Sequence, residues 1–538
     1  MSAGGGEDYM HSDGLREQPD RLASPDGVLS EKGAFDPNAQ VLGMGKKSLV
    51  KNSIFNMAYK GFTALFPLAT TTYISRVLLP EGVGKVAYAN TIVAYFVLIA
   101  SLGLPSYGVK AIAQNDVDKE QRSRTFFELF FINLIATVLC IIAYFLFVNH
   151  FVHFADRRAL FNVMGLMLIL NIFNIDWFYQ GMEEYSYIAT RSVIVKILSF
   201  VLMLVFVKDS GDYLIYALIL CIATAGNNLL NAVQLRKYIT VSVLFRDGNG
   251  AADGRESAAE GMHLGHHMRP VLILLASTIA TEVYTMLDTV MLEYFHGDIY
   301  VGYYSNAVKI VRMTYTVVIA LVAVFYPRIS MYYKQGNREG CNALLSRGTQ
   351  ILLLLALPCA LGLALTAEHV VPLLFKEAFL PSVRTLRILS ILVLIFSVAY
   401  FLGHIVLTAT GMERMILRAC IVGAVLNTVV NLLLIPGMKQ DGAAIASVLS
   451  ETAVTVVLLW YARRYYRLTI TGNYVFSVTA ALAGMAAAVL ALSRWITKDW
   501  MVLPVIAAAA VVYFCILLLF RNELMMELLH KVLGKIRS

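Results

Sequence analysis

Two basic residues, Lys309 and Arg312, lie three positions apart in the apolar stretch 302–326, which is long enough to cross a lipid bilayer. Residues three apart are neighbours on one helix face, and Asn306 lies one turn before Lys309 on that face. With a rise of about 1.5 Å per residue, Lys309 and Arg312 lie about 12 and about 16 Å from the outer end of the helix, near the bilayer centre. A charge there costs at least about 2.5 kcal/mol, so it usually faces a cavity, a bundle interior or a partner charge.

Other predicted membrane helices carry charges at similar depth. Lys60 and Lys196 are further cations, Glu282 and Glu451 are anions, and Asp288 lies closer to the outer surface. Four cations near the centre therefore face two anions, and this positive excess favours an interior that accepts an anion. Arg binds phosphate through two hydrogen bonds and Lys binds it as a point charge. The predicted substrate-binding residues are Lys60, Lys196, Asn306, Lys309 and Arg312.

The three acids are candidates for ion coupling, because a buried carboxyl group can take up and release a proton. Glu282 is the first candidate, and Asp288 and Glu451 follow. A structural role stays open for each charge taken singly, since a lysine can extend its amine toward the membrane surface and a Lys–Glu pair can join two helices.

The composition indicates a membrane protein built from helices. Of the 538 residues, 58% are apolar and 15% are charged, whereas soluble domains carry about 25% charged residues. Apolar runs of about 20 residues recur between positions 52 and 520, without the alternation of a membrane β-barrel. Lipid offers the backbone no hydrogen bonds, so helices are the remaining solution and the predicted fold class is an all-α polytopic membrane protein.

The apolar runs predict fourteen membrane-spanning helices. Most Lys and Arg residues fall in the even-numbered connections, which places these connections and both termini in the cytoplasm, although Arg157 and Arg158 run against this rule. Basic cytoplasmic loops also account for the net charge of +8 without a nucleic-acid partner. The predicted spans are 52–76, 86–108, 126–149, 159–180, 187–207, 213–234, 270–294, 301–326, 346–366, 385–409, 415–435, 442–461, 473–494 and 501–520.

Two pairs of similar segments indicate an internal repeat. VGKVAYAN (83–90) resembles VGYYSNA (301–307), and QGMEEYSYIATR (180–191) resembles TGMERMILR (410–418). Each pair falls at the same place in a six-helix unit, which predicts two six-helix bundles in a parallel repeat, a layout of secondary transporters. The predicted domains are a disordered cytoplasmic tail (1–45), the first bundle (46–234), a cytoplasmic linker (235–269), the second bundle (270–467), and two further helices with a cytoplasmic tail (468–538).

Motifs for other chemistry are weak. The histidines of HLGHHMR (263–269) could bind a metal, but no acidic or cysteine ligand is near, so a solvated linker is favoured. Amides in AGNNLLN (225–231) and at Asn427 and Asn431 favour hydrogen bonds between packed helices. The sequence contains no P-loop, no Ser/His/Asp set and no CxxC pair, so we expect no enzyme activity, no cofactor and no metal.

Residues 66–114 closely resemble the amino-terminal region of bacterial polysaccharide flippases, members of the multidrug/oligosaccharidyl-lipid/polysaccharide exporter superfamily. The shared features are an apolar helix with Pro67, then YISRVL, an acidic–glycine turn, and GLPSYG followed by IA. Weaker resemblance in GMEEYSYIATRS and GYYSNAVKI extends over about 46–467. The layout of twelve plus two helices also resembles the lipid II flippases of this superfamily.

This resemblance implies two bundles in a V around a central cavity, in the cytoplasmic membrane of a bacterium. It implies a substrate, an oligosaccharide on undecaprenyl pyrophosphate, that alternating access carries from the inner to the outer leaflet, driven by an ion gradient or the membrane potential. Implied partners are this substrate, membrane lipid and a polysaccharide polymerase or export machinery. Family members carry cavity cations that meet the pyrophosphate, and Lys60, Lys196, Lys309 and Arg312 could do so here.

Three other functions stay open. A drug–cation antiporter of the same superfamily would favour acids in its cavity, which the positive excess argues against. A membrane-embedded glycosyltransferase or polymerase would need a substantial outer loop with catalytic residues, and the longest outer connection, 367–384, is short. A structural scaffold for a polysaccharide complex would gain nothing from charges near the bilayer centre.

Overall fold

The computed structural model describes residues 46–114, 118–241, 264–465, 469–527 and 529. It forms two units, Met1–Met57 and Ala58–Ser538, and the description below concerns the second. The described residues contain helices and no strand, so the predicted all-α class is confirmed for them. The predicted tail 1–45 lies outside the described residues.

The helices follow one another with short connections. In the first half they are α1 (Lys46–Ala100), α2 (Leu104–Gln114), α3 (Lys119–His150), α4 (Arg158–Met164), α5 (Leu166–Leu170), α6 (Asp176–Gly181), α7 (Tyr185–Phe206) and α8 (Tyr213–Tyr238), with a short 3-10 helix, η1 (Val152–Arg157), before α4. In the second half they are α9 (Leu264–His296), α10 (Asp298–Val322), α11 (Tyr326–Lys334), α12 (Arg338–Phe375), α13 (Ser382–Leu389), α14 (Leu392–Tyr400), α15 (Glu413–Ala462), α16 (Gly472–Ser493) and α17 (Val502–Leu519).

Eleven helical segments of the described residues are long and apolar enough to cross a membrane. Two of them, Phe66–Gln114 and Arg414–Ala462, reach over two predicted spans each. The backbone is broken inside both, at Leu79 in α1 (φ 60°) and at Lys439 in α15 (φ 55°). Such left-handed residues interrupt a helix and let the chain change direction. The predicted span 270–294 lies in α9, which is not among the eleven.

The predicted span 159–180 is not one continuous helix, because α4, α5 and α6 follow one another there with a 3-10 turn at Asn171–Phe173. Such interruptions leave backbone carbonyls without helical partners. Two amides of α8 bond these carbonyls: Asn228 donates to Leu170 at 3.2 Å and Asn231 donates to Phe173 at 3.0 Å. These bonds confirm the prediction that the amides of AGNNLLN join packed helices.

Helix α9 begins at Leu264, inside the predicted linker 235–269. His267 in its first turns is buried: its Nε2 lies 3.0 Å from Glu128 Oε2 of α3, and its Nδ1 lies 2.8 Å from the Tyr107 hydroxyl of α2. The interpretation of the histidine motif as a solvated linker is therefore wrong for His267. These polar contacts instead fix the start of α9 against the first half of the chain.

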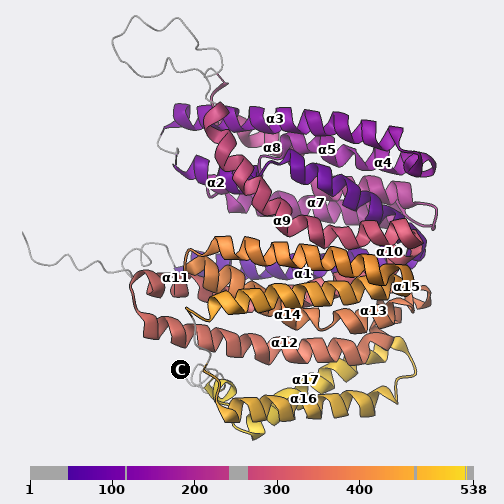
Figure 1. The fold of residues 1–538 in the computed structure, drawn as a ribbon, viewed down its shortest axis with the longest axis vertical. Helices are drawn as coiled ribbons and strands as arrows, with labels where there is room; N and C mark the ends of the chain where they lie inside the picture. The colour runs from indigo at the N-terminus through magenta and orange to yellow at the C-terminus, as the bar shows by residue number, and fades with distance from the viewer. Residues whose placement is uncertain (1–45, 115–117, 242–263, 466–468, 528, 530–538) are drawn as a thin grey trace, which may run out of the picture. The chain divides into compact units, whose positions relative to one another are not determined.

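The last two helices, α16 and α17, pack on each other and on α12 (Figure 1). Tyr474, Met485 and Tyr513 form a core of their own with Leu354 of α12. The Tyr513 hydroxyl donates to the Leu354 carbonyl at 2.9 Å, which satisfies a polar atom in an apolar contact.

Helices from the two halves meet backbone to backbone beside the break in α1. A Cβ added to Gly84 would lie 1.8 Å from the Asp298 carbonyl oxygen, and one added to Gly302 would lie 2.0 Å from the Pro80 carbonyl oxygen. Side chains cannot approach so closely, so only glycine permits this packing. We call this contact, formed by Pro80, Gly84, Asp298 and Gly302, the seam.

Charged side chains join the two halves at the same end. Arg157 of η1 donates its Nη1 to Glu293 Oε1 of α9 at 2.9 Å and to Asp298 Oδ1 of α10 at 2.8 Å. His153 Nε2 lies 3.0 Å from the other oxygen of Glu293, whose side chain is only 1% exposed. This cluster holds η1 against the ends of α9 and α10.

A second polar contact closes this end. Arg76 of α1 donates to the backbone carbonyls of Leu373 and Leu374 in the last turn of α12, and Lys376 Nζ donates to the Arg76 carbonyl at 3.1 Å. Helix C-termini carry partial negative charge, so a cation is favoured there. Together with the seam, these contacts make this the closed end of the helix assembly.

We expect Arg157→Ala to lower the free energy of unfolding by about 2 kcal/mol, because it leaves two acids without their cation. This is less than the loss of a fully buried ion pair, since 25% of the Arg157 side chain is exposed. Thermal unfolding in detergent measures the effect. Arg158→Ala is the matched control, because the exposed side chain of Arg158 donates to the Asn149 carbonyl at 3.3 Å and forms no ion pair with a described residue. Equal melting temperatures for the two variants would contradict the structural role of Arg157.

Candidate functional site

A cavity of about 430 Å³ lies between the two halves of the chain, next to the closed end. Its walls come from α1, α8, α9, α10, α13, α14 and α15. Asp288 and Tyr304, on its side toward the seam, are buried, whereas Glu282 and Arg312, farther along α9 and α10, are exposed. The cavity therefore has a buried floor near the closed end and opens away from it.

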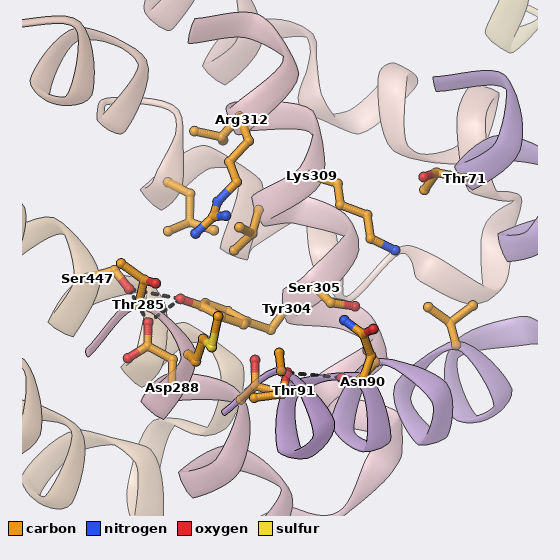
Figure 2. Close-up of a pocket in the computed structure, with 18 of the residues that line it drawn as sticks. Thr71, Asn90, Thr91, Thr285, Asp288, Tyr304, Ser305, Lys309, Arg312 and Ser447 are labelled. Carbon is orange, nitrogen blue, oxygen red and sulfur yellow. Dashed lines mark hydrogen bonds between the residues drawn. The ribbon is translucent and has the colours of Figure 1, made fainter. Parts of the chain in front are cut away.

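Both cations of the opening motif line this cavity (Figure 2). Their side chains diverge: Lys309 points toward Thr71 and Asn90, and Arg312 points to the opposite side, toward Thr285 and the Tyr304 hydroxyl (Figure 2). Among the described residues, no carboxylate lies within ion-pair distance of either cation. An unpaired cation in a cavity is available to an anionic ligand.

All three acids proposed for ion coupling also line the cavity: Glu282, Asp288 and Glu451. Glu282 is exposed, and Glu451 is buried and has polar partners of its own. Asp288 is buried and accepts four hydrogen bonds. The donors are Tyr304 OH and Ser447 Oγ at 2.5 Å each, Asn431 Nδ2 at 2.6 Å and Asn427 Nδ2 at 3.0 Å.

The other three predicted substrate-binding residues are not among the residues shown to line the cavity. Asn306 is buried and does not line the cavity; its Nδ2 donates to Ser75 Oγ of α1 at 2.7 Å. The turn of α10 that bears it is covered by α1 near the seam, which provides this partner. Lys196 is half-buried on α7 and is not a lining residue. The side chain of Lys60 lies outside the described residues.

The charge balance of the cavity differs from the predicted positive excess. Its described lining contains two cations, Lys309 and Arg312, and three acids. The difference arises because Lys196 lies elsewhere, the side chain of Lys60 lies outside the described residues, and Asp288 joins the lining, although its sequence position is nearer to one end of its helix. The charges are separated by helix, however: both cations are on α10, and the acids are on α9 and α15.

Two of the four neutral residues that surround Asp288, Tyr304 and Ser447, are not predicted by the sequence. The prediction that Asn427 and Asn431 form hydrogen bonds between packed helices is confirmed, because both amides of α15 donate to Asp288 of α9. The four-residue spacing of the two asparagines places both amides on one face of α15, and this spacing is the feature of the sequence that indicates a shared partner. Sequence alone could not show that this face meets Asp288 of α9.

Two protein families match this sequence. Residues 49–333 match the family described as "Polysaccharide biosynthesis protein", and residues 260–510 match the family described as "Lipid II flippase MurJ". A curated protein of Escherichia coli (strain K12), named "Putative O-antigen transporter", is 22% identical over 424 residues, which cover 78% of this chain and 97% of that protein.

Solved structures share the fold. "Lipid II flippase MurJ, inward closed conformation" superposes with a TM-score of 0.69 at 11% identity, over 88% of this chain and 100% of that one. A multidrug resistance MATE family transporter of the MOP superfamily, in an inward-facing conformation, gives a TM-score of 0.60 at 16% identity, over 74% and 93% of the two chains. The match to the "Polysaccharide biosynthesis protein" family covers more than half of this chain. The chain therefore belongs to the polysaccharide biosynthesis protein family, within the multidrug/oligosaccharidyl-lipid/polysaccharide exporter superfamily.

Proposed function

We propose that this protein is a flippase that moves an undecaprenyl-pyrophosphate-linked oligosaccharide from the inner to the outer leaflet of a bacterial cytoplasmic membrane. The observation that carries the proposal is the pair of cations inside the cavity, Lys309 and Arg312, neither of which has an acidic partner among the described residues. The names of the E. coli relative and of the matching flippase family support the same substrate class. The protein acts as a transporter and not as an enzyme, and it supplies substrate to a polysaccharide polymerase or export machinery.

The chemistry of the substrate explains why such a cavity is needed. A pyrophosphate cannot enter hydrocarbon without losing its hydration, which is very costly for an anion. Fixed cations in a polar cavity replace part of that hydration. The prenyl chain can remain in lipid while only the phosphorylated head group passes through the protein. A volume of about 430 Å³ is in the range of small-molecule sites and suits this head group better than a long glycan.

The breaks in α1 and α15 support the predicted membrane topology. If each of these elements crosses the membrane twice, turning at Leu79 and Lys439, and α9 crosses once, the chain has the fourteen spans, the two six-helix bundles and the two extra helices predicted from the sequence. Both termini then lie in the cytoplasm, and the seam lies at the outer face. Lys60 would be placed on the first of these spans and Lys196 on the fifth.

The proposed topology also suits a cavity that opens to one side of the membrane at a time. If the seam lies at the outer face, the cavity opens toward the cytoplasm. Export requires the seam and the Arg157 cluster to separate while the cytoplasmic side closes, which is alternating access by movement of one bundle against the other. An ion gradient or the membrane potential drives the cycle.

Among the three acids, Asp288 is the best placed to hold a coupling ion, because it is buried and ringed by oxygen- and amide-bearing side chains. We expect Asp288→Ala to lower transport at least about 10-fold, since it removes this acceptor and leaves four donors unsatisfied. Glu282→Gln, at the exposed mouth of the cavity, is the control and should have a smaller effect. Export of surface polysaccharide, normalised to the amount of folded protein, provides the measurement. Equal loss in both variants would contradict the assignment.

One observation favours a second function. The three acids of the described lining are what a multidrug or cation antiporter of the same superfamily would present to a cationic substrate. This function predicts that cells lacking the protein become sensitive to cationic drugs while surface polysaccharide stays normal. Loss of a membrane-embedded polymerase would differ from both, since it would leave the lipid-linked precursor on the outer leaflet.

The proposed function is tested by deleting the gene in its native host and analysing the lipids. A flippase defect should accumulate lipid-linked oligosaccharide on the inner leaflet, inaccessible to glycan-degrading enzymes added to intact cells. Re-expression of the chain should remove the accumulated lipid. Normal lipid composition together with drug sensitivity would instead establish the antiporter.

A further inference from the structure

The two cations of the cavity differ in what their side chains face. Lys309 extends toward a neutral wall that contains Thr71 and Asn90 (Figure 2). Arg312 extends toward the Tyr304 hydroxyl (Figure 2). That hydroxyl donates to Asp288. Only Arg312 is therefore directed at the group around the buried acid.

In the part of the chain that the structure describes, no cation lies within ion-pair distance of Asp288. All four of its hydrogen-bond donors are neutral: the hydroxyls of Tyr304 and Ser447 and the amides of Asn427 and Asn431. Neutral donors stabilise a carboxylate but leave its net charge in place, and the field of that charge acts strongly on nearby groups in a poorly polarisable interior. Arg312 has no carboxylate within ion-pair distance among the described residues, so it can respond to this field.

We propose that Arg312 is shared between Asp288 and the anionic head group, and that it thereby couples the state of the acid to substrate binding. When Asp288 is negative, it attracts the guanidinium and weakens its hold on phosphate. When Asp288 is neutralised, by a proton or a bound cation, Arg312 is released to the head group. Lys309 binds phosphate independently of Asp288. This inference rests on the proposed function, because it requires a phosphorylated substrate in the cavity.

The coupling is reciprocal, since two ligands that change each other's affinity must do so by the same factor. A cation at Asp288 and a head group at Arg312 therefore stabilise each other. In an exchange mechanism, by contrast, a cation and the substrate would compete for binding. The coupling by itself therefore does not produce exchange of a cation for the substrate.

A double-mutant cycle tests this coupling. The full-length protein in detergent is titrated with a short-chain prenyl pyrophosphate glucose, a diester whose charge does not change near neutral pH. Asp288→Asn should raise affinity for this probe at least about 5-fold in the wild-type background and in Lys309→Gln. In Arg312→Gln, the same substitution should change affinity less than about 2-fold. Asp288→Ser, which also removes the charge, replaces Asp288→Asn should the latter fail to fold.

The possible results separate the inference from the proposed function. If Asp288→Asn still raises probe affinity in the Arg312→Gln background, the coupling role of Arg312 is overturned. The coupling role is also overturned if the gain in affinity is lost to the same extent in the Lys309→Gln background. Binding of the probe by the wild type would still support a flippase in those cases. No binding of the probe to the wild type overturns both the proposed function and the inference.

Discussion

Replacing both Lys309 and Arg312 by alanine is expected to abolish export of surface polysaccharide while the protein remains folded in the membrane. The two residues are the cations of the described cavity lining, and within the described ranges neither has an acidic partner whose charge would be left unpaired. Stability should therefore change little. Transport should fall at least about 100-fold, because charge-assisted hydrogen bonds to phosphate contribute about 1.5–3 kcal/mol each.

The measurement combines surface polysaccharide with the position of its lipid-linked precursor. In cells with the double variant, the precursor should accumulate on the inner leaflet, as in the deletion strain. Lys196→Ala is the matched control, because Lys196 is a half-buried lysine of a membrane helix that does not line the cavity. Normal export by the double variant, or an equal defect in the control, would remove the assignment of the two cations.

Replacing Gly302 by valine is expected to prevent closure of the end that carries the seam. The new Cβ would lie 2.0 Å from the Pro80 carbonyl oxygen, and backbone atoms cannot yield as a flexible side chain can. The two halves must therefore separate at this point, which also strains the bonds of Arg157 to Glu293 and Asp298. We expect a near-complete loss of transport, since a transporter open at both ends or locked outward cannot complete its cycle.

Accessibility at the seam measures this effect. A cysteine introduced at Pro80 in a cysteine-free background should be unreactive toward a membrane-impermeant thiol reagent in the parent protein and reactive in Gly302→Val. The control is Gly211→Val, because a Cβ at Gly211 meets no atom within 4 Å. Unchanged reactivity in Gly302→Val would show that the seam is not the barrier on this side.

The sequence predicted those features that depend on a single helix. The lengths of the apolar runs predicted the helices. The three-residue spacing of Lys309 and Arg312 predicted that both cations of this helix face the same interior, and both line the cavity. Hydrophobicity could not show that the region 159–180 is interrupted, because the amides that bond its freed carbonyls, such as that of Asn228, lie on another helix. The burial of His267 has a similar origin, since its partners, Tyr107 and Glu128, come from α2 and α3.

Features that depend on contacts between helices could not be predicted from one sequence. Asn306 shares a helix face with Lys309, yet its partner is Ser75 of α1, at the edge of the interface between the two halves. The group around Asp288 draws on α9, α10 and α15, and no spacing along the chain indicates that these three helices meet there. Helical periodicity fixes the angle of a side chain around its own helix, but it does not identify the helix opposite.

Reconstitution of the purified protein tests the central claim most directly. Vesicles containing an undecaprenyl-pyrophosphate-linked oligosaccharide are given an inside-negative potential, and an enzyme added outside reports the substrate that reaches the outer leaflet. The wild type should move the substrate faster than empty vesicles and faster with the potential than without it, and the Lys309/Arg312 double variant should match empty vesicles. Equal rates for the wild type and the double variant would contradict the claim that these two cations carry the head group.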